Sequence, residues 1–264
     1  EDIEAGGRLT ISAVNGVGAT DPGTPADAAL ETAVGSVDIT NSTSGAIAIV
    51  ETDGVTLHQV VQSTTGDITI SAGGSVTIAS GTDQGVSIPL GQANTVTITS
   101  TGGDIDAAAD DGDTEIAART ISLTASNTDA AIGDGGTSLD VNATVSLSAS
   151  ASSGTGNIVV DDVTGEMPVT VVNAGTGNVT LNAAGSVTDT NGVATNVSGD
   201  DLTVNAAGGI DLDTDVNTLT LTATASGDVL IADADGVTVL EATSTNSTIE
   251  ISTGGTGDIV VGDD

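Results

Sequence analysis

A short phrase recurs along this sequence: a glycine, at most one polar residue, and then an apolar–polar–apolar triplet. Residues 63–88, STTGDITISAGGSVTIASGTDQGVSI, contain it three times, as GDITI, GSVTI and GVSI. Alternation with period two is typical of a strand with one buried and one solvated face. Such triplets continue from Leu9 to Val261, and no segment keeps a helical period. The chain is therefore predicted to be all-β.

The spacing of the triplets narrows the architecture to two classes. Successive triplets start at residues 37, 47, 55, 68, 76, 86 and 96, which fits a sandwich or barrel or a parallel β-solenoid. The triplets are short, and the chain has no Phe, Trp or Tyr to fill the thick core of a sandwich. We therefore predict a parallel β-helix, or β-solenoid, with short strands and about two or three strands per coil.

Glycines at matching positions support this prediction. A glycine precedes many strands, and Asp or Asn often follows it. We expect this glycine to turn a corner at positive φ, and the following side chain to bond the backbone or to form an amide ladder. The glycines are Gly66, Gly103, Gly156, Gly177, Gly185, Gly227 and Gly257, and the polar residues are Asp67, Asp104, Asn157, Asn178, Asp228 and Asp258.

The repeat covers residues 1–264 as a single solenoid segment, with two interruptions. Residues 16–35 contain two prolines and no clear strand, so we expect a loop or a short helix there; a second insertion is expected around Asp110. At about 20–30 residues per coil, the chain would form roughly 9–12 coils and a rod of roughly 45–60 Å. The chain begins and ends within the pattern, which we interpret as part of a longer repetitive protein.

The net charge of the chain limits the classes of partner that it can bind. The formal net charge is -35, with two Lys or Arg residues against 37 Asp or Glu, and there is no cysteine. Nucleic acid and anionic membranes are disfavoured electrostatically, whereas divalent cations and cationic partners are favoured. No apolar run approaches the roughly 20 residues of a membrane span, so we expect no membrane insertion.

The repeats resemble those of a known group. GDITISAGGSVTIAS (66–80), GNVTLNAAGSVTDT (177–190) and LTVNAAGGIDLDTD (202–215) are similar to the repeats of filamentous-haemagglutinin-type and related large bacterial adhesins. The resemblance implies a right-handed parallel β-helix on a cell surface. It also implies an extracellular protein that binds a host or neighbouring cell. The chain lacks the aromatic residues and lysines common in that group.

Acidic runs are candidate calcium sites, because calcium prefers six to eight oxygen ligands, several of them carboxylates. None of the runs completes an EF-hand loop. The alternative is that they are solvated acids in turns. The candidates are Asp110, Asp111, Asp113, Asp211, Asp213, Asp215, Asp233 and Asp235.

Three functions remain open at this point. The first is an extracellular structural or adhesive β-solenoid within a surface fibre or filament, without catalysis, that associates end to end or continues into further repeats. The second is a calcium-dependent surface-layer or matrix component. The third is a carbohydrate-active β-helix, although such enzymes often use aromatic or Arg-rich sugar subsites. The sequence therefore predicts no catalytic residue.

Overall fold

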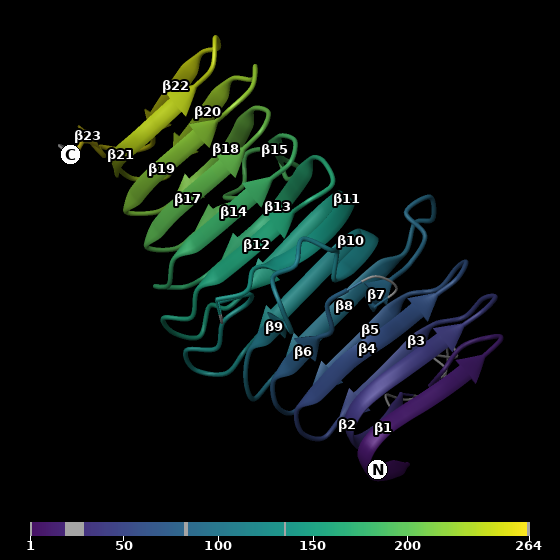
Figure 1. Ribbon diagram of the computed structural model, residues 1–264. Helices are drawn as coiled ribbons and strands as arrows, with labels where there is room; N and C mark the ends of the chain where they lie inside the picture. Colours follow the sequence, from purple (N-terminus) through teal and green to yellow (C-terminus); the bar gives the residue numbers. More distant parts are fainter. Residues whose placement is uncertain (1, 19–28, 82–83, 135, 263–264) are drawn as a thin grey trace.

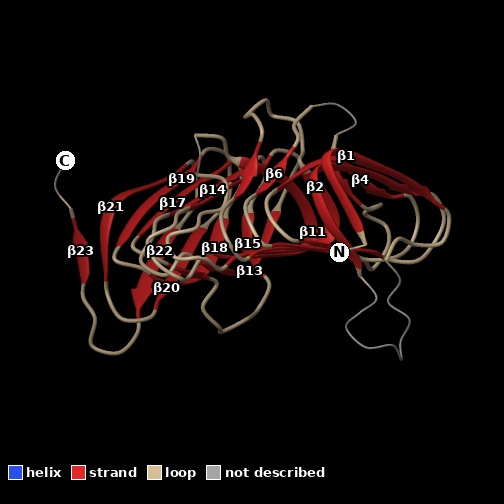
Figure 2. Cartoon of the chain, turned by 90° about the horizontal axis from the view of Figure 1, so that it is seen from below, coloured by secondary structure: helices blue, strands red, loops and turns tan. Residues whose placement is uncertain are grey.

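The computed structural model describes residues 2–18, 29–81, 84–134 and 136–262, and these form a β-solenoid of about 11 turns (Figure 1). The described residues contain strands, turns and bends but no helix (Figure 2), and every strand pairing is parallel. The predicted fold class is confirmed.

The strands of the N-terminal half are β1 (Ile3–Ala13), β2 (Leu30–Asn41), β3 (Ile47–Glu51), β4 (Val55–Gln62), β5 (Ile68–Ala72), β6 (Val76–Ile78), β7 (Gly85–Ser87), β8 (Thr95–Ser100), β9 (Ile105–Ala107), β10 (Ile116–Ala125) and β11 (Leu139–Ser150). Those of the C-terminal half are β12 (Ile158–Asp162), β13 (Met167–Asn173), β14 (Val179–Ala183), β15 (Val187–Asp189), β16 (Val197–Ser198), β17 (Asp201–Ala206), β18 (Ile210–Asp215), β19 (Thr218–Ala223), β20 (Val229–Asp233), β21 (Val237–Ser244), β22 (Ile249–Thr253) and β23 (Ile259–Val261).

Strands of successive coils stack along the axis of the solenoid. One stack runs through β3, β5, β8 and the second halves of β10 and β11. Another runs through β12, β14, β17, β19 and β21. The longer strands β10 and β11 continue around a corner, where the register of their pairing shifts between Ala118 and Thr120. The first halves of β10 and β11 therefore lie on a different side of the coil. On that side, the first half of β11 pairs with β12.

The core is a set of inward rows of aliphatic side chains. In one row Ile68 pairs with Val96, Val96 with Ile121, and Ile121 with Leu147, and each is fully buried. The residues between them in each strand point outward because side chains alternate along a strand. Branched aliphatic side chains, repeated in every coil, thus fill a narrow core without aromatic residues.

The recurrent glycines are required mainly by close stacking. Of the seven predicted corner glycines, only Gly66 has a positive φ, of 135°. At Gly177, a Cβ atom would lie 2.2 Å from the carbonyl oxygen of Gly156 in the preceding coil, which a side chain does not tolerate. The prediction of a left-handed corner is therefore wrong for six of these positions. Their glycines allow the backbones of neighbouring coils to approach.

The polar residue after the glycine has the predicted role at several corners. Asp67 Oδ1 accepts from the Thr95 N–H at 2.8 Å, and Asp104 Oδ1 accepts from the Ala131 N–H at 2.9 Å. Asn157 Oδ1 accepts from the Asn178 N–H at 2.8 Å. In each case the donor belongs to the next coil, so these side chains tie successive corners together.

The two expected insertions differ in outcome. Within 16–35, residues 19–28 lie outside the described residues, but Val17 pairs with Ile47 and β2 already begins at Leu30. The end of this segment is therefore strand rather than loop or helix, because Val34 is inward and buried beside the core. Residues 108–113 do form an exposed loop between β9 and β10, as predicted.

Candidate binding groove

One outward row differs from the rest of the surface in its chemistry. Asp140 pairs in register with Asp161, Asp161 with Asn182, Asn182 with Asn205, and Asn205 with Thr222. Glu115 precedes β10 and stands beside Asp140 at the head of this line. We call these six residues the polar row. It places a carboxylate, amide or hydroxyl at every coil, about 4.8 Å apart.

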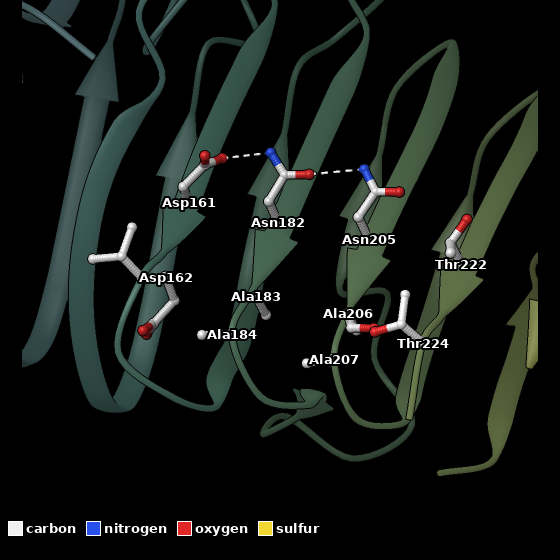
Figure 3. A pocket seen from close by; sticks show the side chains of 11 residues that line it. Asp161, Asp162, Asn182, Ala183, Ala184, Asn205, Ala206, Ala207, Thr222 and Thr224 are labelled. Carbon is white, nitrogen blue, oxygen red and sulfur yellow. Dashed lines mark hydrogen bonds between the residues drawn. The ribbon is translucent and has the colours of Figure 1, made fainter. Parts of the chain in front are cut away.

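The amides of the polar row form a ladder. Asn205 Nδ2 donates to Asn182 Oδ1 at 2.8 Å, and Asn182 Nδ2 donates to Asp161 Oδ1 at 2.5 Å (Figure 3). Both bonds run in the same direction, toward the carboxylate. Each amide NH₂ has a second hydrogen, and Asn205 Oδ1 can still accept a bond. The ladder fixes the side chains and leaves a line of polar atoms available.

A groove runs beside this row across β12, β14, β17 and β19. It has a volume of about 360 Å³, within the size range of small-ligand sites. Alanines at the ends of β14 and β17, namely Ala183, Ala184, Ala206 and Ala207, line it together with Asp161, Asp162, Val163, Asn182, Asn205, Thr222 and Thr224 (Figure 3). The groove therefore combines an apolar strip with a polar edge.

Asp162 is a buried carboxylate that lines the groove. The residue is 1% exposed. Oδ1 accepts from the Thr164 N–H at 3.0 Å, the Thr164 hydroxyl at 2.9 Å and the Gly165 N–H at 3.0 Å. Oδ2 has no hydrogen-bond partner among the described residues. A buried acceptor without a donor is costly, so Oδ2 is a place where a ligand donor is favourable.

A second cavity continues the groove toward the N-terminal coils. It has a volume of about 300 Å³, and Asp161 and Asn182 line both cavities. Its other lining residues include Asp110, Asp134 and Ser138. The two cavities are adjacent, and the second one, which Asp110 of the 108–113 loop helps to line, has the more acidic lining.

Two buried carboxyl groups, Glu115 and Asp140, stand at the head of the polar row, and each residue is 2% exposed. The Asp140 N–H donates to Glu115 Oε2 at 2.8 Å, while Glu115 Oε1 and Asp140 Oδ2 have no partner among the described residues. Burial raises the pKa of Glu115 to about 7. Burial, together with the charges of Asp161 and Asp110, raises the pKa of Asp140 to about 6. A proton is therefore retained in this pair at mildly acidic pH.

The predicted calcium residues are distributed over three places. Asp211, Asp213 and Asp215 lie on the outward side of β18, as their spacing of two predicted. Burial, with the charges of Asp189 and Asp213, raises the pKa of Asp211. Asp110, Asp111 and Asp113 lie in the exposed 108–113 loop, where Asp111 Oδ1 accepts from the Asp113 N–H at 3.0 Å.

Asp233 has a structural environment, whereas Asp235 is exposed. Asp233 Oδ2 accepts from the Thr214 hydroxyl and the Val216 N–H, and Oδ1 accepts from the N–H groups of Asp235 and Gly236. Among the residues that the structure describes, no group of three or more His, Cys, Asp or Glu side chains is arranged to hold a metal ion. Calcium binding by the eight acidic residues stays a prediction.

Comparison with known protein families, with curated proteins and with solved structures finds no match. Within the described part of the chain, no helix is long and apolar enough to cross a membrane. The fold shown is that of a β-helix repeat protein.

Sequence reasoning did not single out Asp161, Asp162, Asn182 or Asn205. A signal for two of them was present: LNAAG at 181–185 and VNAAG at 204–208 repeat the same phrase at the end of a strand. The phrase places an Asn on the outer face and two alanines at the corner of each coil. The two phrases, in adjacent coils, supply the asparagines and alanines that line the groove.

Proposed function

We propose that this chain is an extracellular structural and adhesive β-solenoid of the large-adhesin type, a segment of a cell-surface fibre that acts without catalysis. The observation that carries the proposal is the continuous core, in which inward rows such as Ile68, Val96, Ile121 and Leu147 extend from coil to coil. About 11 turns at about 4.8 Å per turn give a rod of roughly 50 Å. Such a rod spans distance and presents long lateral surfaces.

The same parallel pairing that joins coils within the chain can join coils of successive copies or of further repeats. The strongly acidic surface, with a net charge of -35, opposes unspecific lateral clustering. Electron microscopy of the purified chain tests this part of the proposal. Filaments or end-to-end chains of rods are expected, and isolated rods of roughly 50 Å at every concentration would contradict self-association.

A calcium-dependent surface-layer or matrix component is the second candidate. The net charge of -35 favours it, because a strongly acidic surface attracts divalent cations. In that case calcium would raise the melting temperature and promote assembly. Unchanged melting and assembly after chelator treatment would exclude it.

A carbohydrate-active β-helix is the third candidate, and the groove beside the polar row is where its substrate would lie. Release of new reducing ends from polysaccharides by the purified chain would replace the non-catalytic proposal with this one. Binding without release agrees with an adhesive role.

A further inference from the structure

We propose that the groove along β12, β14, β17 and β19 binds a short linear oligosaccharide without acidic groups, laid parallel to the fibre axis. The inference names a ligand class for the proposed adhesive function and rests on that function. Two observations point to a ligand here: the buried, unpartnered Oδ2 of Asp162 at the wall of the groove, and the fixed amide ladder along its edge.

The polar atoms suit vicinal hydroxyl groups. Asp162 Oδ2 needs a donor, which a sugar hydroxyl supplies, while the second amide hydrogens of Asn182 and Asn205 need acceptors. A hydroxyl can be donor and acceptor at once, so one ring can satisfy both demands. Ala184, Ala207 and Val163 line the groove from exposed or half-exposed positions. They offer an apolar surface for the C–H face of a sugar ring, in keeping with a mostly apolar site that has a few fixed polar groups.

The spacing favours a glycan over a peptide. The polar row repeats once per coil, about every 4.8 Å, and a glycan chain advances by a comparable distance per ring. An extended peptide repeats its same-side groups only about every 6.6–6.8 Å, so it falls out of step with the row after one or two coils. A peptide also cannot extend the sheet here, because its axis would cross the strands.

The charge excludes acidic sugars. Asp161 and Asp162 border the groove, Asp110 and Asp134 line its continuation, and the whole chain carries a net charge of -35. A carboxylate or sulfate on the ligand would meet like charge in a partly buried site. A neutral sugar is accepted, and an amino group at the acidic end of the groove strengthens binding.

Titration calorimetry of the full chain tests the proposal with three probes: neutral β-1,4-linked glucose oligomers, glucosamine oligomers and galacturonic acid oligomers. Binding of a neutral or amine-bearing probe is expected, with at least about tenfold weaker binding of the acidic one.

Two variants test the residues of the groove. Asp162→Asn keeps the acceptor that holds the Thr164 turn and replaces Oδ2 by a donor, so it should weaken binding about tenfold. Ala207→Leu fills the groove from a half-exposed position and should abolish binding.

Ala232→Leu is the matched control, since Ala232 is an exposed alanine on β20, away from the groove, and it should bind like the wild type. Unchanged melting temperatures show that each variant is folded. The proposal is overturned if no neutral or amine-bearing probe binds, if Ala207→Leu binds like Ala232→Leu, or if oligolysine binds and every sugar fails. Failure of these tests with filaments intact in the microscope removes the ligand but not the fibre. Sugar binding by rods that stay isolated in the microscope removes the fibre but not the ligand.

Discussion

Two lateral surfaces of this solenoid are built on the same strand pattern but use their polar residues differently. The first, which we call the hydroxyl face, comprises Thr69, Ser71, Thr97, Thr99, Ser122, Thr124, Ser148 and Ser150, paired in register on β5, β8, β10 and β11. The second is the polar row with its groove. Both are outward positions of parallel strands at the same coil spacing.

The two faces differ in whether outward side chains of successive coils bond one another. Of the eight hydroxyl-face residues, only Ser150 has a side-chain hydrogen bond to another described residue, to the Ser152 hydroxyl at 3.3 Å. Hydroxyl groups of successive coils can bond one another, as those of Thr170 and Thr190 do at 2.7 Å, but the described residues of the hydroxyl face form no such pair. The amides of Asn205 and Asn182 do bond from coil to coil. The same fold therefore gives one unbonded face and one fixed ladder.

The largest effect on the free energy of unfolding should be the same behind both faces. Ile98, behind the hydroxyl face, and Leu181, behind the groove, are both fully buried. Substituting either with alanine should lower the free energy of unfolding by about 2–5 kcal/mol, because a buried aliphatic group is lost and a cavity remains. Denaturant titration measures both. A loss below about 1 kcal/mol at one site only would show that the core is not continuous between the two regions.

The next largest effect is on the pH dependence of stability, and it is confined to the acidic end of the polar row. The pKa of Glu115 is raised from 4.5 to about 7, so the folded state holds more protons than the unfolded state between these values. Stability should therefore fall as pH rises through this window, and Glu115 should account for roughly 1–3 kcal/mol of the fall.

Thermal melting of Glu115→Gln from about pH 5 to about pH 8 measures this effect, and the variant should lose part of the slope. Asp113→Asn removes the same charge from the exposed loop and serves as control. Equal slopes in the two variants would assign the pH dependence to overall charge repulsion.

A smaller effect is expected within the ladder. Asn182→Ala removes the donor to Asp161 Oδ1 and the acceptor for Asn205 Nδ2, and it should cost about 1 kcal/mol since each such bond contributes modestly in a half-exposed site. Denaturant titration gives the value. An unchanged free energy of unfolding would mean that the ladder orients side chains without stabilising the coils.

The smallest effect is expected on the hydroxyl face. Thr97 is half-exposed and its hydroxyl bonds no described residue, so Thr97→Val should change the free energy of unfolding by less than about 0.5 kcal/mol. Valine has the same shape and a high strand propensity. A loss comparable to that of Asn182→Ala would contradict the contrast drawn between the two faces.

The sequence predicted what depends on local alternation. The inward rows through Ile68 and Val96 and the loop at 108–113 follow from periodicity and composition. The groove does not, because it depends on which coils are neighbours. Ile68 pairs with Val96, 28 residues later, whereas Leu202 pairs with Leu219, 17 residues later. With coil length so variable, the alignment of residues from separate coils becomes visible only once the register is known.

The corner glycines illustrate the same limit. Their positions were evident from the sequence, but their cause was not. Positive φ is a property of one residue, whereas the close approach of Gly177 to Gly156 belongs to two coils. The buried Asp162 likewise looks like an ordinary turn residue until the groove beside it is known.

The contrast between the faces is tested most directly by NMR of the isotopically labelled chain titrated with the glucosamine oligomer. The side-chain amide signals of Asn182 and Asn205 should shift progressively, while the backbone signals of Thr97 and Thr99 stay in place. Shifts centred on the hydroxyl face, or spread evenly over both faces, would contradict the assignment of the groove as the binding surface.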